Sequence, residues 1–403
     1  MIKITNMKEK LVLAFSGGLD TSFCAKYLSE EKGFEVHSVI VNTGGFSREE
    51  LKTIEQKAYA LGVEKHVTLD VTDEYYEKCI RYMIYGNMLR NNTYPMSVSS
   101  ERLFQAMALA DYARKTGARH IAHGSTGAGN DQVRFDLVFQ IVMPEVAIIT
   151  PIRDMKLSRN AEIEYLKSKG VEDNWEKKSA YSINKGLWGT SIGGKETLES
   201  HTWLPEEAFP SPLKKQGAEV IDIQFVKGEI TALNGMEMRG ADAIRALEEK
   251  ASAYAIGRDT NVGDTIIGIK GRVGFEAAAP LILIKAHHLL EKHTLTKWQQ
   301  YWKDQLSGWY GMLLHEAQYL EPVMRDIERF LENSQQYVTG QVSVRLQPYR
   351  FEVLGVSSPH DLMNAKFAKY GEENNAFSGQ DVIGFTKILG NQMKIWYSVN
   401  DPQ

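Results

Sequence analysis

The sequence predicts an α/β protein that begins with a doubly wound parallel sheet. Residues 11–15, 36–41 and 66–71 form runs of strand length that are rich in apolar side chains. Such runs are typical of strands that are buried on both faces of a parallel sheet. Segments with helical periodicity separate them, and this alternation favours a doubly wound sheet. In such a sheet, ligands bind outside the carboxyl ends of the strands.

The segments between these strands contain residues that typically begin and end helices. Ser47 and Glu50 have the spacing of a capping box, and the helix that they start stops at Gly62. Further along the chain we expect two more strands and another helix, at 118–124, 145–151 and 158–170.

Beyond residue 172 the pattern changes to an α+β arrangement. Hairpin-like and helical segments follow one another at 219–235, 241–257, 295–334 and 340–356. We therefore expect a first domain over 1–172, a second over 173–375 and a helical tail over 376–403.

The tail has a strongly apolar composition. Its large apolar side chains are Ile383, Phe385, Ile388, Leu389, Met393, Ile395 and Trp396. A terminal helix of this kind packs on its own core or on a neighbouring subunit, and we favour the neighbouring subunit.

The composition of the 403 residues excludes several classes of protein. With 43% hydrophobic and 24% charged residues the chain is an ordinary globular protein, and its net charge of −4 gives no general attraction to nucleic acid. Cys24 and Cys79 can form neither a disulfide framework nor a metal site. Since no run of about 18 apolar residues occurs, we expect a cytoplasmic protein without a membrane segment.

The first predicted strand leads directly into a Gly-rich loop, LAFSGGLDTS, at 13–22. Gly17 and Gly18 allow close approach of the backbone to a ligand, and a helix N-terminus with nearby hydroxyl groups suits a polyanion. The hydroxyl groups belong to Ser16, Thr21 and Ser22. Because the loop has no lysine, the neutralising charge must come from Mg²⁺, with Asp20 as a candidate ligand, or from another segment. The alternative is a tight turn capped by Asp20 or Thr21.

The SGGLDTS motif is similar to the phosphate loop of ATP pyrophosphatases, which split ATP into AMP and pyrophosphate. A second Gly-rich segment, HGSTGAGNDQVRFD at 123–136, resembles the signature of argininosuccinate synthase. The resemblance continues through YPMSVSS, YSINKGLWGTS and IGIKGRVGFE, and so covers about the first three quarters of the chain.

The resemblance implies a ligase of arginine biosynthesis that works in two steps. The ureido oxygen of citrulline would attack the α-phosphorus of ATP, and the amine of aspartate would then displace AMP. It further implies a first domain that binds the nucleotide, a synthetase domain, an oligomerisation helix and a homotetramer. The residues that would carry the chemistry are Asp20, Asn130, Asp131 and Arg134.

Matching motif to motif gives the expected binding residues. The ATP site would be formed by Ala14, Phe15, Ser16, Gly17, Gly18, Leu19, Asp20, Thr21, Ser22, Val41 and Gly124. Aspartate would be bound by Thr126, Asn130 and Asp131. Citrulline would be bound by Tyr94, Ser99, Asn130, Arg134, Ser182, Ser191, Gly263 and Phe275.

The chain departs from the family pattern at one end of the citrulline site. Gly263 stands where the family has a glutamate that would pair with the α-ammonium of citrulline, and Phe275 stands where it has a tyrosine. The family's Asp-Glu-Asn is replaced by residues 184–186, which include Lys185. Gly45 replaces a glutamine, and the sequence offers no chemical interpretation of that change.

These departures remove negative charge or polarity, or add positive charge. We therefore hypothesise that the substrate is an N-acylated citrulline, acetyl or succinyl, whose acyl group uses the space at Gly263 and whose extra carboxylate, if present, meets Lys185. The alternative is free citrulline, with Asp264 moving in to replace the lost carboxylate.

Other functions compatible with the first loop are a different ATP pyrophosphatase ligase, an RNA thiolase and a non-catalytic adenine-nucleotide-binding module. A thiolase would be expected to have paired cysteines and a basic face, which this sequence lacks. A binding module would not need Asn130, Asp131 and Arg134.

Overall fold

The computed structural model describes residues 8–173, 175, 181–368, 370–371 and 376–401. Its first part is a parallel five-stranded sheet in the order β3-β2-β1-β4-β5. The strands are β1 (Lys10–Ala14), β2 (Glu35–Asn42), β3 (Lys65–Asp70), β4 (His120–Ala122) and β5 (Ala147–Ile149). Chain order reverses between β1 and β4, so the segments that follow these two strands lie side by side at the carboxyl edge of the sheet.

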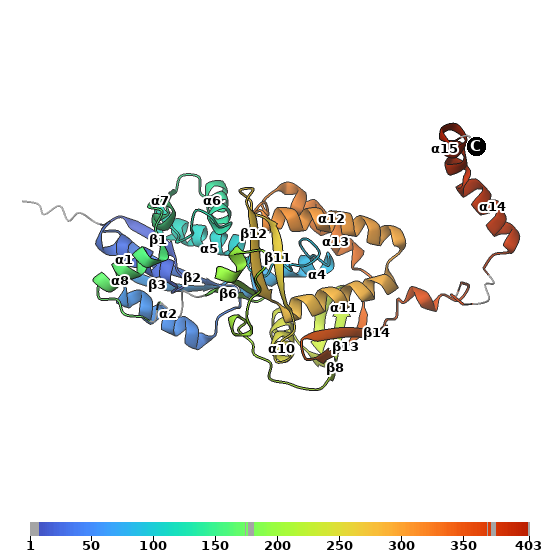
Figure 1. The fold of residues 1–403 in the computed structure, drawn as a ribbon, viewed down its shortest axis with the longest axis horizontal. Helices are drawn as coiled ribbons and strands as arrows, with labels where there is room; N and C mark the ends of the chain where they lie inside the picture. Colours follow the sequence, from blue (N-terminus) through green and yellow to red (C-terminus); the bar gives the residue numbers. More distant parts are fainter. Residues whose placement is uncertain (1–7, 174, 176–180, 369, 372–375, 402–403) are drawn as a thin grey trace, which may run out of the picture.

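Helices cover both faces of this sheet (Figure 1). Because side chains alternate along a strand, Leu11 and Leu13 of β1 pack in one core layer and Val12 packs in the other. The first layer contains side chains of α1 and α8, and the second contains side chains of α5 and α6. The helices of this part are α1 (Leu19–Glu30), α2 (Arg48–Ala60), α5 (Glu101–Thr116), α6 (Asp131–Val142), α7 (Pro151–Asp154) and α8 (Arg159–Ser168). The predicted doubly wound fold is confirmed.

The rest of the molecule contains two antiparallel sheets. A five-stranded sheet, β10-β9-β8-β13-β14, packs against α10 (Gly240–Ser252) and α11 (Ala278–Thr294). Its strands are β8 (Glu219–Val226), β9 (Glu229–Leu233), β10 (Met236–Glu237), β13 (Gly340–Gln347) and β14 (Arg350–Ser357). The helical segment predicted at 295–334 consists of α12 (Lys297–His315) and α13 (Pro322–Ser334).

The second antiparallel sheet was not predicted from the sequence. It has four strands in the order β11-β12-β7-β6 and lies between the parallel sheet and the rest of the second part (Figure 1). Its strands are β6 (Tyr181–Gly186), β7 (Gly189–Gly194), β11 (Arg258–Asp264) and β12 (Lys270–Glu276). Short 3₁₀ helices flank the sheets at Lys195–Leu198, Glu206–Ala208 and Leu362–Asn364.

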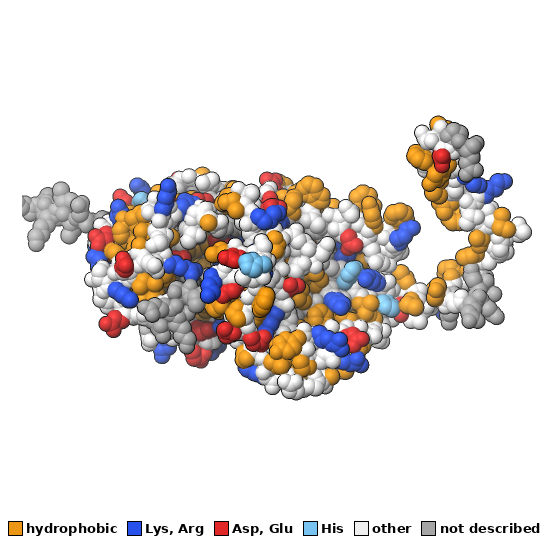
Figure 2. Space-filling model, viewed as in Figure 1, with side chains coloured by type: hydrophobic (Ala, Val, Ile, Leu, Met, Phe, Trp, Pro, Cys, Tyr) orange, Lys and Arg blue, Asp and Glu red, His pale blue; other side chains and the backbone are white. Residues whose placement is uncertain are grey.

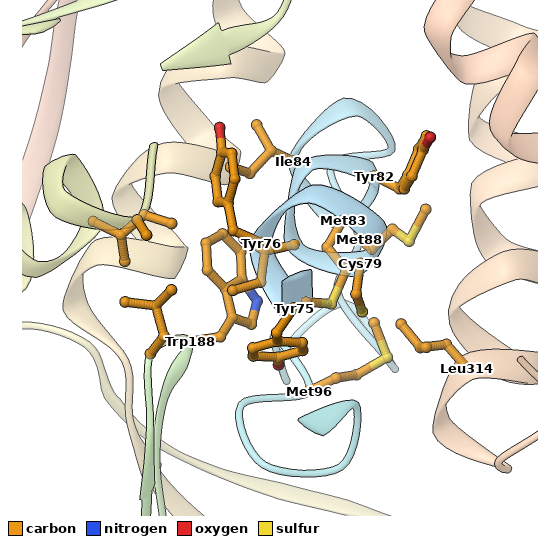
Figure 3. Packing of buried hydrophobic residues seen from close by; sticks show 14 of the residues in the cluster. Tyr75, Tyr76, Cys79, Tyr82, Met83, Ile84, Met88, Met96, Trp188 and Leu314 are labelled. Atoms are coloured by element: carbon orange, nitrogen blue, oxygen red, sulfur yellow. The ribbon is translucent and has the colours of Figure 1, made fainter. Parts of the chain in front are cut away.

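A central helical segment joins the two halves of the molecule. It consists of α3 (Thr72–Tyr75), the π-helix η1 (Tyr76–Ile80) and α4 (Arg81–Tyr85), and α4 packs against α11 and α13. Figure 3 shows its side chains packed with those of Trp188 and Leu314. The indole nitrogen of Trp188 donates to the carbonyl oxygen of Pro95 at 2.9 Å, which fixes the four-stranded sheet against the segment after α4.

The tail consists of α14 (Gly379–Leu389) and α15 (Asn391–Asn400) and extends away from the rest of the molecule (Figure 1). Figure 2 shows apolar side chains gathered along it, and Phe385, Ile388 and Trp396 are 63%, 78% and 58% exposed. Within the described ranges, no helix combines the length and apolar character that spanning a membrane requires.

Candidate active site

The first Gly-rich loop forms the turn between β1 and α1. Gly17 has a φ of +76°, a left-handed conformation that favours glycine, and a Cβ there would lie 3.3 Å from Cγ1 of Ile54. Gly18 is the residue before α1 and has no side chain that could bond the first N–H groups of the helix. These N–H groups point out of the helix end, so the turn has the features of an anion-binding cradle.

The loop contains no lysine, but α2 brings one to it. Nζ of Lys57 donates to the carbonyl oxygen of Gly17 at 2.7 Å and to the carboxylate of Asp173 at 2.9 Å. The same ammonium lies 4.3 Å from the centroid of the Trp175 ring. A neighbouring segment thus places a lysine beside the turn, where it holds the Gly17 carbonyl oxygen while the Asp173 carboxylate balances its charge.

Asp20 lies where the two Gly-rich segments meet. A Cβ on Gly124 would be 3.2 Å from the carbonyl carbon of Asp20, so a glycine at 124 lets the second segment approach α1. The carboxyl group of Asp20 lies near that of Glu162 of α8, and burial raises the pKa of Asp20. Burial and the Asp20 carboxylate raise the pKa of Glu162 to about 8. The two carboxyl groups therefore share a proton at neutral pH.

We expect Glu162→Gln to stabilise the protein at alkaline pH. The pKa of Glu162 in the folded protein is about 8, whereas its ordinary value is 4.5. The folded state therefore gains stability from this proton at pH values below the ordinary pKa, and it loses that stability as the pH rises through about 8. An amide is neutral without a proton. Thermal melts should therefore show a stability gain for the variant of about 2–4 kcal/mol above pH ~8 that shrinks toward pH ~5.

Glu164→Gln is the matched control, because Glu164 is an exposed glutamate on the same helix. It should show no such pH-dependent gain. Melting curves of the Glu162 variant that run parallel to those of the wild type at every pH would contradict the shared proton.

Asp131 is the first residue of α6 and lies between two arginines. Its carboxylate accepts from Nε of Arg102 at 2.9 Å and from Nη1 of Arg134 at 2.8 Å. Burial alone would raise the pKa of Asp131, but the two guanidinium groups outweigh it and lower the pKa to about 2. Arg134 is buried, and its Nε donates to the carbonyl oxygen of His315 at 3.1 Å. Asp131 is thus a charged, fixed carboxylate at neutral pH.

The second Gly-rich segment also contacts the hairpin between β11 and β12. Oδ1 of Asn130 accepts from the backbone N–H of Ile266 at 2.9 Å. Thr126 lies on the exposed part of the segment, and its Oγ1 would be 3.8 Å from a Cβ on Gly129. The hairpin therefore holds Asn130 directly beside Asp131.

The four-stranded sheet brings four of the expected citrulline residues to one face. Ser191 of β7 lies opposite Asn184 of β6 on one side and Phe275 of β12 on the other. Ser182 is two residues from Asn184, and the pairing of β11 with β12 places Gly263 on the same face as Phe275. Directly paired residues and residues two apart share a face of a sheet, so Ser182, Ser191, Gly263 and Phe275 line a common surface.

Tyr94 and Arg102 connect this face to the second Gly-rich segment. The ring centroids of Tyr94 and Phe275 are 5.4 Å apart. Nη2 of Arg102 donates to Oδ1 of Asn184 at 3.0 Å, while its Nε holds Asp131. Ser99 is buried below, and its hydroxyl donates to the carbonyl oxygen of Met96 at 3.4 Å. The structure thus brings most of the residues expected to bind aspartate and citrulline close to one another.

Comparison with known proteins identifies the family. Residues 10–172 match the arginosuccinate synthase N-terminal HUP domain, and residues 181–396 match the arginosuccinate synthase C-terminal domain. The chain belongs to the argininosuccinate synthase family. It is accordingly an ATP-dependent ligase, which agrees with the resemblance of the two Gly-rich segments rather than with a thiolase or a binding module.

Relatives from distant organisms align with nearly the whole chain. The argininosuccinate synthase of Methanocaldococcus jannaschii is 36% identical over 97% of this chain and 98% of its own length. That of Xanthomonas campestris is 37% identical over 97% of this chain and 99% of its own length. That of Dictyoglomus turgidum is 35% identical over 96% of each chain.

The structure shows what lies beside Gly263, where the resemblance to the family implies a glutamate. A Cβ on Gly263 would lie 2.8 Å from Nδ2 of Asn91, which donates to the carbonyl oxygen of Val262 at 3.0 Å. Asn91 therefore takes part of the space that the sequence analysis left for an acyl group. Asp264 does not take the place of the lost carboxylate, because it faces the opposite side of β11 and pairs with Lys270 at 2.6 Å.

The expectation that Lys185 meets a substrate carboxylate is wrong. Lys185 follows Asn184 in β6, so its side chain lies on the opposite face of the sheet from Ser191. Its Nζ is 3.7 Å from Oε1 of Glu50. Gly45 now has a structural reason, since a Cβ there would be 2.3 Å from the carbonyl oxygen of Lys185. Glycine is needed for the β6–β7 hairpin to close against the end of β2.

Sequence reasoning missed three charged residues of the site, which are Lys57, Arg102 and Glu162. Each contacts a predicted residue from a separate helix, α2, α5 or α8. None of the three belongs to a Gly-rich motif. Only the packing of those helices around the carboxyl edge of the sheet could have indicated that they lie at the site.

Proposed function

We propose that this chain joins a citrulline substrate to aspartate and cleaves ATP to AMP and pyrophosphate through an adenylylated ureido intermediate. The observation that carries the proposal is the position of Asp131. It is held between Arg102 and Arg134 next to the substrate face of the four-stranded sheet, while Gly124 of the same segment contacts Asp20 of the first loop. A site of this kind can align three substrates.

In the first step, the ureido oxygen attacks the α-phosphorus and pyrophosphate leaves. N–H groups at the start of α1 bind the departing phosphates, and Lys57 holds the turn in place through the carbonyl oxygen of Gly17. Arg134 and Asn130 hold the ureido end of citrulline. Before the second step, the charged carboxylate of Asp131 positions the ammonium of aspartate. The ammonium then loses a proton, the resulting amine attacks the ureido carbon, and the C–O bond to AMP breaks, so that the phosphate of the departing AMP can take up the proton. Alignment and charge compensation of this kind supply most of the acceleration in phosphoryl chemistry.

Mg²⁺ fits the nucleotide site through Asp20. Two carboxyl groups as close as those of Asp20 and Glu162 need a proton or a cation between them or beside them. Among the described residues no cluster of three or more metal-ligating side chains exists, which is consistent with an ion held mainly by substrate phosphates and one or two carboxylates. When bound there, Mg²⁺ would neutralise phosphate charge.

We further propose that the substrate carries an acyl group on its α-nitrogen. Gly263 and Phe275 offer no partner for an α-ammonium, and Asp264 faces away. On the same face of β11 the next carboxylate is Asp259, four residues or about 13 Å from Gly263. An ammonium bound without a carboxylate partner loses roughly 2–5 kcal/mol, whereas an acylated nitrogen is neutral and needs none.

The test is a comparison of citrulline, N-acetylcitrulline and N-succinylcitrulline under identical conditions, with pyrophosphate release as the readout. We expect kcat/KM for free citrulline to be about 30-fold or more below that of an acylated form. Release of pyrophosphate should require the citrulline substrate, and AMP should be released only when aspartate is present. Efficient turnover of free citrulline would contradict the acylated substrate but not the ligase.

We also propose that the protein is a cytoplasmic homotetramer and that the tail packs on a neighbouring copy. Support comes from the exposed apolar side chains of α14 and α15 and from exposed aromatic residues of α12, namely Trp298, Tyr301, Trp302 and Trp309. Burying such side chains contributes about 1.5–3 kcal/mol each. Removal of residues 376–403 should lower the mass measured by sedimentation equilibrium, and an unchanged tetramer would contradict the role of the tail.

A further inference from the structure

Arg90 lies at the end of the site where the chain departs from its family. It begins a tight loop that two backbone hydrogen bonds with Tyr94 close, at 2.8 and 3.0 Å. Asn91 and Asn92 in this loop have φ values of 53° and 58°, a left-handed conformation that residues other than glycine seldom adopt. Asparagine adopts this conformation more readily than most other residues, so both asparagines suit the loop. The loop holds Arg90 and Asn91 against β11 at Gly263.

Arg90 is half-buried, and the carboxylate that its guanidinium group faces, that of Asp264, is too far away to form an ion pair with it. Nη2 of Arg90 donates to the backbone carbonyl oxygen of Asp264 at 3.4 Å. The carboxylate of Asp264 is paired with Lys270 instead, and in the described parts of the chain no other carboxylate forms an ion pair with Arg90. A guanidinium that meets a neutral carbonyl oxygen only can still bind a carboxylate with two parallel hydrogen bonds.

A neutral histidine next to Arg90 makes this end of the site more suitable for an anion. Burial, Arg134 and Arg90, in that order, lower the pKa of His315 to about 2, so its ring is uncharged. Nδ1 of His315 is buried without a hydrogen-bond partner among the described residues. The ring can therefore donate an N–H to an oxygen atom of a ligand.

On the sheet, Asn261 supplies an unused acceptor. It lies two residues before Gly263 on the same face of β11, is 7% exposed, and its Oδ1 has no partner in the described structure. Its Nδ2 would be 3.7 Å from a Cβ on Gly263. A buried polar group without a partner is costly, so a ligand group that bonds to it is favoured.

We propose that Arg90 and Asn261 form a subsite for the acyl group and that this group ends in a carboxylate. The N–H of the acylated α-nitrogen donates to Oδ1 of Asn261, and the terminal carboxylate binds the guanidinium group of Arg90. A dicarboxylic half-amide such as N-succinylcitrulline satisfies both groups, whereas an acetyl group leaves Arg90 unpaired. This inference rests on the proposed acylated substrate, and it assigns to Arg90 the role that we first expected of Lys185.

The test measures kcat/KM with N-succinylcitrulline and N-acetylcitrulline for the wild type, Arg90→Gln and Arg90→Lys. We expect the wild type to prefer the succinyl substrate by about 10- to 100-fold, since hydrogen bonds to a charged group are worth that much in affinity. Arg90→Gln should bring this ratio close to one, mainly through KM. Arg90→Lys keeps the charge but not the planar fork and should give an intermediate ratio.

Arg345→Gln is the control, because it removes one positive charge from an exposed pair with Glu352 in the β13–β14 hairpin. Its ratio should equal that of the wild type. If both acylated substrates react equally, or if Arg90→Gln lowers both to the same extent, the Arg90 subsite is wrong while the acylated substrate stands. If only free citrulline reacts, the proposed substrate itself is wrong, and the subsite with it.

Discussion

Asp131→Asn is expected to lower kcat/KM for aspartate by about 1,000-fold. The carboxylate accepts from Arg102 and Arg134, and its pKa of about 2 shows that it is charged whenever the enzyme works. An amide leaves both guanidinium groups without their shared partner and cannot pair with the incoming ammonium. Arg134 is buried and Arg102 is largely buried, while the Asp131 side chain is 38% exposed. Truncating one partner of a hydrogen-bonded charge pair of this kind costs roughly 2–5 kcal/mol.

The two proposed steps of the reaction should separate in this variant. Exchange of labelled pyrophosphate into ATP depends on the citrulline substrate alone and should fall by about tenfold or less, because Arg134 retains its bond to His315. Most of the loss in rate should occur in the formation of the aspartate adduct. If both steps decline equally, Asp131 acts on the structure of the site and not on aspartate.

Asp136→Asn is a matched control for the loss of stability. Asp136 is also on α6 and also holds an arginine, since it accepts from Arg153 at 2.6 Å and contacts His123 at 2.8 Å. Its removal should lower the melting temperature without the 1,000-fold effect on aspartate. A comparable loss of activity in both variants would indicate that any damage to α6 inactivates the enzyme.

The parallel sheet could be predicted because its information is local. Residues 11–15 are apolar throughout, and the Gly-rich loop follows them without interruption, so strand, turn and helix are all encoded within about 20 residues. The proximity of Asn130, Asp131 and Arg134 could be predicted in the same way, since a single motif contains all three.

The four-stranded sheet could not be predicted from local sequence, and the wrong expectations at the citrulline site follow from that. Its strands come from two distant segments, and Gly-rich runs such as 189–194 have little strand character of their own. Without the strand assignment, the alternation that sends Lys185 and Asp264 to the far face could not be used. Asn91 was missed because its bond to Val262 joins residues 171 positions apart.

Exchanging two residues is expected to make free citrulline an efficient substrate of the enzyme. Gly263→Glu introduces the carboxylate that the resemblance to the family implies at this position, but a Cβ there would be 2.8 Å from Nδ2 of Asn91. Asn91 has a φ of 53°, which glycine adopts without strain, so Asn91→Gly removes the obstructing amide and suits the backbone. The double variant should gain about 30-fold to several-thousand-fold in kcat/KM for free citrulline, the value of pairing the α-ammonium.

The two single variants separate the contributions of space and charge. Asn91→Gly alone creates room without a carboxylate and should leave free citrulline a poor substrate. Gly263→Glu alone has to displace the amide of Asn91 and its bond to Val262, so it should gain less than the double variant. A double variant that binds free citrulline no better than the wild type does, as measured by calorimetry on folded protein, would mean that Gly263 does not face the α-nitrogen of the substrate.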